Sequence, residues 1–318
     1  MIQHRRTANS LSITFAACLV ATWPHVAVGE SDSARVERLF MMASSGEVRF
    51  QDMVQPAKDS LAAMGEAAAI GLARKLNVTD ARERQTLADL FAAIGSVAVP
   101  HVVPFLDSTG EYMPKNAARC LGRIADSSAT LPLIPKLRHE LYAVRSEVAT
   151  ALGKIADRRA VNDLIACLET ESDSDVRKSC TVALGEIGDT TAATTLIRCL
   201  GDSFFGVRQS ALESLAKMKP PPVSELAAAV HQYSGVARHG AIVALGATGD
   251  ERARTFMIDM LGSPDPFIRG FAVEGLSADS TAGTRTQIQL LQGRESDFFV
   301  LAQIARWESA RQGQTKTQ

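Results

Sequence analysis

The sequence is poor in aromatic residues, in net charge and in motifs of catalysis. Aromatic residues make up 5% of the 318 residues, and the formal net charge is −1. A near-neutral chain has no bulk electrostatic attraction for nucleic acid or for an anionic membrane. The chain contains no Gly-x-Ser-x-Gly motif, no P-loop and no dinucleotide-binding fingerprint. We therefore expect neither an enzyme nor a nucleic-acid-binding protein.

Histidine is also scarce. After residue 30 it occurs only as His101, His139, His231 and His239. No two of them have the spacing of metal ligands, and none is flanked by cysteines or carboxylates in a zinc pattern. We predict no catalytic residues, no metal site and no cofactor.

What the sequence does have is one pattern repeated along the chain. Leu184 has counterparts at intervals of 30 to 32 residues, which are Leu121, Leu152, Leu215, Leu245 and Leu276. Pro114 stands seven residues before Leu121, and every other copy has an arginine there: Arg145, Arg177, Arg208, Arg238 and Arg269. A fixed period in this range is typical of a solenoid, in which each repeat buries its apolar face only by stacking on its neighbours.

Residues 175–189 show the pattern most clearly and predict one amphipathic helix. Its apolar residues share one face: Val176, Cys180, Ala183, Leu184 and Ile187. Asp175 is the expected N-cap, and Gly188 is the expected left-handed residue after the helix. A first kind of helix should precede each copy of this second kind, over residues 66–76, 97–106, 131–141, 160–169, 192–200, 223–231, 252–261 and 284–291. No segment of comparable quality predicts a strand.

Val176, Arg177 and the run from Ala183 to Asp189 resemble the short HEAT-like repeat first associated with phycobilisome lyases. The resemblance covers about residues 65–291. It implies an all-α fold, a right-handed α-solenoid of stacked helix pairs with a period of about 31 residues. It also implies that the second helix of each pair lines a concave, protein-binding side.

Residues 1–29 have the pattern of an export signal: a basic start, an uncharged apolar run over 11–23 and small residues at 27–29. The apolar run, about 13 residues, is shorter than the ~20 that span a bilayer. We expect cleavage before Glu30, a periplasmic or secreted mature chain and no integral membrane segment after cleavage. An uncleaved anchor and a lipoprotein processed at Cys18 are the alternatives. We assign residues 30–64 to capping helices, 65–312 to the solenoid and 313–318 to a disordered tail.

Several repeated residues have a structural explanation. One arginine per repeat, at the start of the second helix, can bridge to an acidic or carbonyl group of the neighbouring repeat, such as Asp157 or Asp189. Glycine inside a helix costs ~1 kcal/mol relative to alanine but lets neighbouring helices approach closely. The repeated positions of this kind are Gly122, Gly153, Gly185 and Gly246.

Two features leave alternatives open. Cys167 and Cys180 lie on antiparallel helices at similar distances from their turn; they are the best placed for a disulfide, although free thiols are favoured. Phe204 and Phe205 stand where other turns are polar. We favour a role in plugging the groove between repeats, with an exposed aromatic contact as the alternative.

The partner-binding residues are predicted from the face of the second helices opposite the core. Positions one, five and nine after the repeat arginine should share that solvent-facing stripe. They include five basic residues, which are Lys115, Arg119, Arg123, Lys154 and Lys178. A binding site there would take an acidic protein partner, whereas a merely solvated flank would bind nothing.

Two functions are compatible with this sequence. The first is an exported, non-enzymatic scaffold or adaptor that binds a protein through the concave face. The second is an accessory or regulatory subunit of an enzyme complex. Lyase-like chromophore attachment, which the family name suggests, is disfavoured, because an exported chain would have to meet its chromophore outside the cytoplasm.

Overall fold

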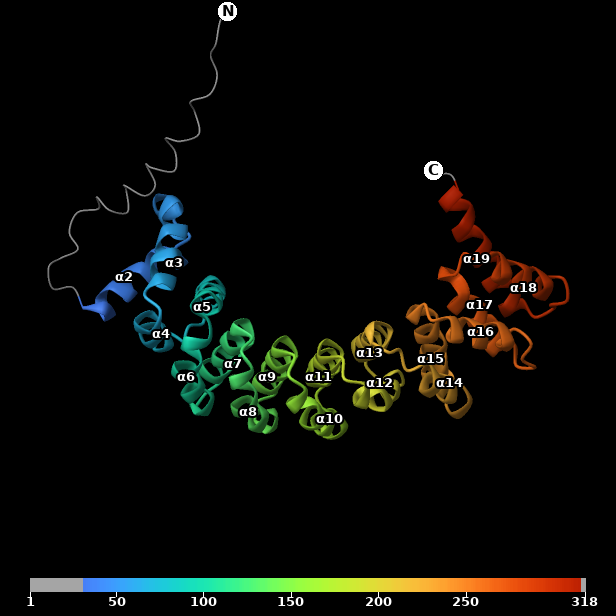
Figure 1. The fold of residues 1–318 in the computed structure, drawn as a ribbon, viewed down its shortest axis with the longest axis horizontal. Coiled ribbons are helices and arrows are strands. Elements are labelled where there is room, and N and C mark those ends of the chain that lie inside the picture. The colour runs from blue at the N-terminus through green and yellow to red at the C-terminus, as the bar shows by residue number, and fades with distance from the viewer. Residues whose placement is uncertain (1–30, 316–318) are drawn as a thin grey trace, which may run out of the picture. The chain divides into compact units, whose positions relative to one another are not determined.

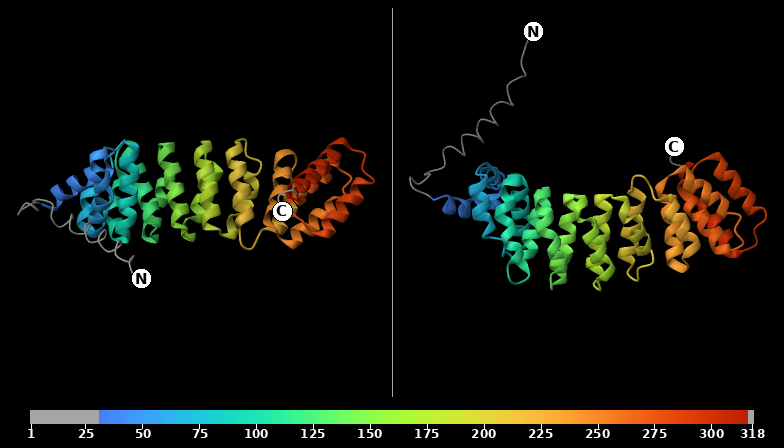
Figure 2. Two further views of the ribbon diagram at one scale, coloured as in Figure 1. Left: turned by 90° about the horizontal axis from the view of Figure 1, so that it is seen from above. Right: turned by 60° about the horizontal axis from the view of Figure 1, so that its bottom comes forward.

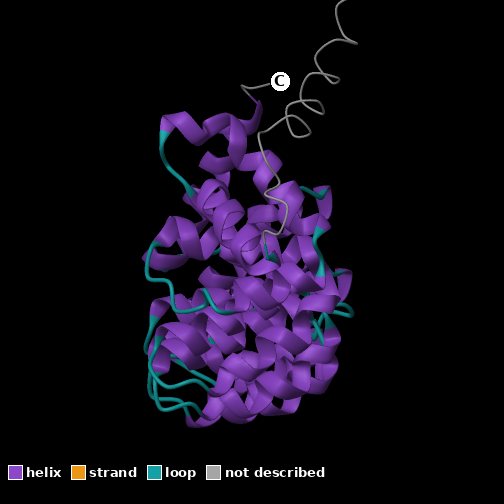
Figure 3. Ribbon diagram, turned by 90° about the vertical axis from the view of Figure 1, so that its left-hand side faces the viewer, coloured by secondary structure: helices purple, strands orange, loops and turns teal. Residues whose placement is uncertain are grey.

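The computed structural model describes residues 31–315, and over these residues it consists of helices and connecting loops without a strand (Figures 1 and 3). The all-α prediction is therefore confirmed. The predicted export signal and residues 316–318, half of the predicted tail, lie outside the described residues. Contacts divide the chain at residues 126 and 127 into two units, which we describe in turn.

Over residues 31–126 the first unit contains six α-helices, of which the earliest is α2 (Asp32–Ser44). The others are α3 (Val54–Ala63), α4 (Glu66–Ala73), α5 (Ala81–Ile94), α6 (Val99–Val102) and α7 (Tyr112–Ile124), with the 3-10 helices η1 (Val48–Met53), η2 (Gly95–Ala98) and η3 (Val103–Asp107). Helix α3 packs against α5, and α5 packs against α7, while α4 contacts α6 on the other side. Leu61, Leu87, Phe91 and Leu121 are fully buried between these helices.

Residues Ala81–Asp107 are long and apolar enough, by length and composition, to cross a membrane. The structure does not form one straight helix there. Gly95 has a φ of 80°, and the chain turns at this residue from α5 into η2 and α6. Helix α5 then packs on α7 and helix α6 on α4, as two members of adjacent pairs.

The second unit stacks helix pairs in two layers (Figure 1), and Figure 2 shows the pairs following one another along the chain. The second helices of the pairs form one layer: α9 (Tyr142–Ile155), α11 (Ser174–Ile187), α13 (Phe205–Lys217), α15 (Gly235–Thr248), α17 (Pro266–Gly275) and α19 (Phe298–Thr315). The first helices form the other: α8 (Thr130–Leu133), α10 (Val161–Thr170), α12 (Ala193–Cys199), α14 (Val223–Gln232), α16 (Glu251–Met260) and α18 (Ala282–Gln292). Short 3-10 helices complete the pairs: η4 (Ser127–Ala129), η5 (Ile134–Arg138), η6 (Arg158–Ala160), η7 (Thr190–Ala192) and η8 (Leu276–Ala278). Each second helix packs on the next one, from α9 to α19.

Helix α11 shows why these residues form the repeat. Val176, Cys180, Ala183 and Leu184 are buried, and Ile187 is half-buried, so the predicted apolar face is the core face. Gly188 ends the helix with a φ of 68°, as predicted.

The N-cap of α11 is Asp173, and the prediction of Asp175 was wrong. The Asp173 carboxylate accepts the backbone N–H groups of Asp175 and Val176 at 2.9 and 3.1 Å. These are the second and third N–H groups after the cap, which an N-cap side chain normally satisfies. Asp175 instead lies inside the first turn, where a negative charge stabilises the helix dipole.

Candidate docking surface

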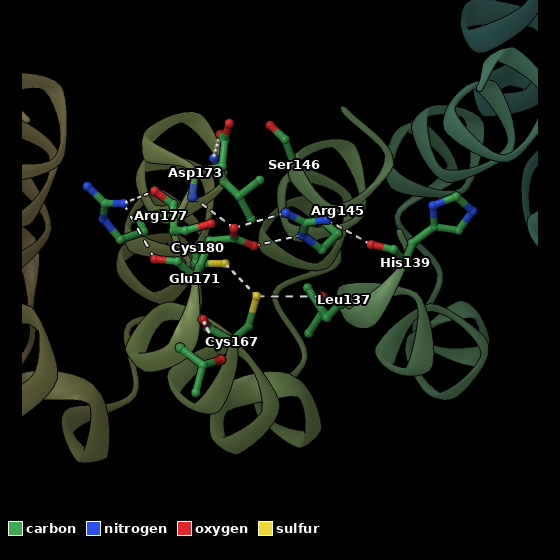
Figure 4. Close-up of polar contacts among 12 residues, drawn as sticks. Leu137, His139, Arg145, Ser146, Cys167, Glu171, Asp173, Arg177 and Cys180 are labelled. Carbon is green, nitrogen blue, oxygen red and sulfur yellow. Dashed lines mark hydrogen bonds and ion pairs between the residues drawn. The ribbon is translucent and has the colours of Figure 1, made fainter. Parts of the chain in front are cut away.

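The repeat arginines of the second unit join each second helix to the turn of the following pair. Nε and Nη2 of Arg145 donate to the two carboxylate oxygens of Glu171 at 2.7 and 2.9 Å (Figure 4). Nη1 of Arg145 donates to the carbonyl oxygens of His139 and Glu140, in the turn before its own helix. Two further pairs follow the same plan, Arg177 with Asp202 and Arg269 with Glu295. Arg238 also bridges to a carboxylate, but with Nη1 to Asp265, while its Nε donates to the carbonyl oxygen of Tyr233. The predicted structural role is therefore confirmed for these four arginines.

The predicted partners of these arginines were wrong. Asp157 and Asp189 follow the second helices, so they lie at the opposite end from the arginines that begin those helices. Each of them starts a 3-10 helix instead, accepting the backbone N–H of Arg159 or Thr191 at 2.9 Å. The partner carboxylates precede the next second helix, because that end of the pair faces the arginine.

Cys167 and Cys180 contact each other between α10 and α11 (Figure 4). Their Sγ atoms are 3.6 Å apart, and none of the four described cysteines forms a disulfide. The Cys180 thiol lowers the pKa of Cys167, and the Arg145 and Arg138 charges act in the same direction. Cys167 also lines a groove of about 740 Å³. We therefore expect Cys167 to be the more reactive thiol of the pair.

We expect N-ethylmaleimide to label Cys167 first in the folded protein. Cys167 is half-buried with a lowered pKa, whereas Cys120, Cys180 and Cys199 are buried, and burial raises the pKa of Cys199 to about 11. Peptide mapping by mass spectrometry after brief labelling at pH 7 measures the order. Cys167→Ser should leave the native protein nearly unlabelled, and early labelling of Cys120 or Cys199 would contradict the prediction.

Three of the predicted partner-binding residues lie on α7 of the first unit. Lys115 and Arg119 are half-buried and Arg123 is exposed. Nζ of Lys115 lies 3.2 Å from the Glu111 carboxylate, and Nη2 of Arg123 lies 2.7 Å from Asp89 of α5. These pairs offset part of the positive charge that the sequence places on α7.

The other two predicted residues, Lys154 and Lys178, lie in the second unit, on α9 and α11. Both are exposed, and neither forms an ion pair with another described residue. The five predicted residues are therefore divided between the two units, three in the first and two in the second. Lys154 and Lys178 remain as unpaired cations of the predicted stripe.

We call the positions one, five and nine after the repeat arginine on α9, α11 and α13 the second-helix face. Seven of its nine residues are exposed: Lys154, Lys178, Val182, Glu186, Gln209, Glu213 and Lys217. Ser146 and Thr150 are half-buried, and the Ser146 hydroxyl bonds to that of Ser179 on α11. The predicted solvent-facing stripe does not continue on α17, because Gly270, one residue after Arg269, is buried.

Phe204 and Phe205 do not plug the groove between repeats. Their exposed fractions are 41% and 67%, so the favoured interpretation was wrong, and both rings are exposed as the alternative of an aromatic contact requires. Both residues stand at the start of α13, where a second helix begins at the surface.

An aromatic cluster on α17 and α19 was not predicted. The Phe271 ring lies 5.3 Å from that of Phe299 and 4.3 Å from that of His239, centroid to centroid. Nε2 of His239 is 3.0 Å from the Glu274 carboxylate, and this contact lowers the pKa of Glu274. In a chain poor in aromatic residues, the presence of Phe267 and Phe271 within α17 was the sequence feature that could have indicated this cluster.

No group of three or more His, Cys, Asp or Glu side chains in the described part of the chain is arranged to hold a metal ion.

Comparisons with known proteins give two family matches. The HEAT repeats model matches residues 99–184, and the PBS lyase HEAT-like repeat model matches residues 176–202. No curated protein matches the sequence.

Several solved structures are similar to the chain. The complex of CpcE and CpcF of phycocyanin lyase from Nostoc sp. PCC7120 is 17% identical, with 91% of this chain and 97% of that chain covered and a TM-score of 0.40. Human deoxyhypusine hydroxylase in complex with glycerol is 18% identical, with 80% and 99% covered and a TM-score of 0.36. An engineered protein is 20% identical, with 87% and 88% covered and a TM-score of 0.39.

Proposed function

We propose that this HEAT-like repeat protein is an exported scaffold, without catalytic activity of its own, that binds a protein partner through its second-helix face. HEAT repeats generally mediate protein–protein interactions. The observation that carries the proposal is the exposed row on α9, α11 and α13, whose side chains take little part in packing. Export rests on the pattern of residues 1–29.

The partner surface opposite Lys154 and Lys178 is acidic in this proposal. Both ammonium groups are exposed, without a carboxylate partner in the described chain. Glu186 is also exposed on the second-helix face, and its negative charge would repel an acidic partner. The attraction for such a partner is therefore confined to the surroundings of Lys154 and Lys178. Exposed charges of this kind act mainly on the association rate and on its salt dependence.

The match to the PBS lyase HEAT-like repeat at residues 176–202 favours a second candidate. This second candidate function is that of an accessory or regulatory subunit of an enzyme complex. The two candidates differ in the partner, which is an enzyme only in the second.

Reversing Lys154 and Lys178 to Glu is expected to weaken partner capture about tenfold without changing the thermal melt. The physical reason is that both side chains are exposed and outside the core, so the loss falls on binding alone. The measurement is capture from the periplasmic fraction, identified by mass spectrometry, at low and at high salt. Absence of the protein itself from that fraction would contradict the export part.

A matched control reverses two exposed arginines outside the second-helix face, Arg285 on α18 and Arg294 in the turn after it. This control should capture the partner as the natural chain does. Equal capture by the Lys154 and Lys178 variant, with an unchanged melt, would refute the face as a docking site.

A further inference from the structure

Arg208 is the exception among the repeat arginines of the second unit. Its Nη1 donates to the carbonyl oxygens of Asp202 and Ser203 at 2.8 and 3.0 Å, as Nη1 of Arg145 does to its own turn. The guanidinium is therefore held in the same place as in the other repeats. Yet no carboxylate of a described residue pairs with it, whereas Arg145, Arg177 and Arg269 each hold one with Nε and Nη2.

The sequence explains the missing carboxylate. Arg145 and its partner Glu171 are 26 residues apart, and the residue at that distance from Arg208 is Ser234. A serine hydroxyl supplies neither the charge nor the two acceptor oxygens that match a guanidinium fork. The Asp202 carboxylate, in the turn before Arg208, is already used, because both its oxygens accept from Arg177 and one also accepts the N–H of Phe204.

One exposed aromatic ring lies beside this open fork, and a second stands next to it in the sequence. The Arg208 guanidinium lies 5.6 Å from the centre of the Phe205 ring, which is 67% exposed, and Phe204 is 41% exposed. An arginine held by two carbonyls beside an exposed aromatic ring combines a fixed, directional charge with apolar area. Arginine and aromatic residues are the types that dominate binding energy at protein interfaces.

We propose that Arg208 binds an aspartate or glutamate side chain of a protein partner, through Nε and Nη2, with an apolar neighbour of that side chain packed on Phe205. The partner supplies the carboxylate that Glu171, Asp202 and Glu295 supply to the other arginines. This site goes beyond the proposed function, since it does not involve Lys154 or Lys178. We assign a carboxylate as the ligand because Arg145, Arg177 and Arg269 each bind a carboxylate with the same two nitrogen atoms, Nε and Nη2.

The test uses two capped peptides, acetyl-Leu-Glu-Leu-amide and acetyl-Leu-Gln-Leu-amide, added to the full-length protein labelled with ¹⁵N. The measured signal is the Nε–H resonance of Arg208, assigned by its loss in Arg208→Lys. We expect the Glu peptide to shift it with a millimolar Kd and the Gln peptide to bind at least about tenfold more weakly, because hydrogen bonds to charged groups are worth ~1.5–3 kcal/mol. The Nε–H resonances of Arg145, Arg177 and Arg269 are internal controls that should not move.

Three results would overturn the proposal. Equal shifts with both peptides would mean that the peptides bind by apolar contact without a carboxylate. No shift with either peptide would mean that Nε and Nη2 of Arg208 are not accessible to a ligand. A shift with inorganic phosphate but not with the Glu peptide, at equal ionic strength, would assign the site to a phosphate group. Loss of Glu-peptide binding in Arg208→Lys, followed by the shifts of the Phe204 and Phe205 backbone amides and with an unchanged circular dichroism spectrum, would support it.

Discussion

Replacing Gly246 with Ala is expected to lower the free energy of unfolding of the second unit by about 3 kcal/mol or more. A Cβ at this position would lie 2.1 Å from the carbonyl oxygen of Gly275 and 2.8 Å from its carbonyl carbon. Both atoms are backbone, so no side-chain rotation relieves the clash. The helices α15 and α17, which pack directly on each other, would have to separate.

Gly283→Ala is the matched control. Gly283 lies in α18, and a Cβ there would meet nothing within 4 Å. Alanine is a better helix former than glycine, so this variant should gain up to about 0.5–1 kcal/mol. Urea unfolding followed by circular dichroism measures both variants. Equal stabilities of Gly246→Ala and Gly283→Ala would show that the close approach of α15 and α17 is not required.

The close approach of the second helices could be predicted from the sequence. Glycine stands at the same position of several copies, and an added Cβ at Gly153, Gly185 or Gly246 would indeed meet the neighbouring second helix. The period of 30 to 32 residues also placed the helices to within a few residues. Both results follow from the one-dimensional order of a solenoid, where the neighbour in space is the neighbour in sequence.

The ion-pair partners could not all be predicted in the same way. Arg145 faces Glu171 and not Asp157, because helical spacing tells which face a residue is on but not which end of the next pair meets it. Glu111 stands four residues before Lys115, so that pair was visible as an i,i+4 contact. The pair of Arg123 with Asp89 joins two helices and required the structure.

Replacing Arg269 with Met is expected to destabilise the last helix pair, α18 and α19, by about 3 kcal/mol at pH 7. The Glu295 side chain is only 4% exposed, and its two oxygens accept from Nε and Nη2 of Arg269 at 2.7 and 3.0 Å. Removing the arginine would leave a buried carboxylate without its cation. Trp307 of α19 is the only tryptophan after residue 30, so its fluorescence reports unfolding of this pair.

The double variant Arg269→Met with Glu295→Leu is the control for this prediction. Replacing both partners with apolar side chains of similar size removes the uncompensated charge, so most of the lost stability should return. A double variant as unstable as Arg269→Met would instead assign the loss to the Nη1 bonds with the carbonyls of Ser263 and Pro264.

The loss caused by Arg269→Met should also depend on pH. The side-chain hydrogen bond from Arg269 lowers the pKa of Glu295 from 4.5 to about 2. A carboxyl whose pKa is depressed by folding contributes stability that is fully present above pH 4.5 and is lost as the pH falls towards 2. The difference in stability between the natural chain and Arg269→Met should therefore be constant from pH 7 to about 5 and should shrink below it. A difference that stayed constant down to pH 2.5 would show that the ion pair does not stabilise this end of the chain.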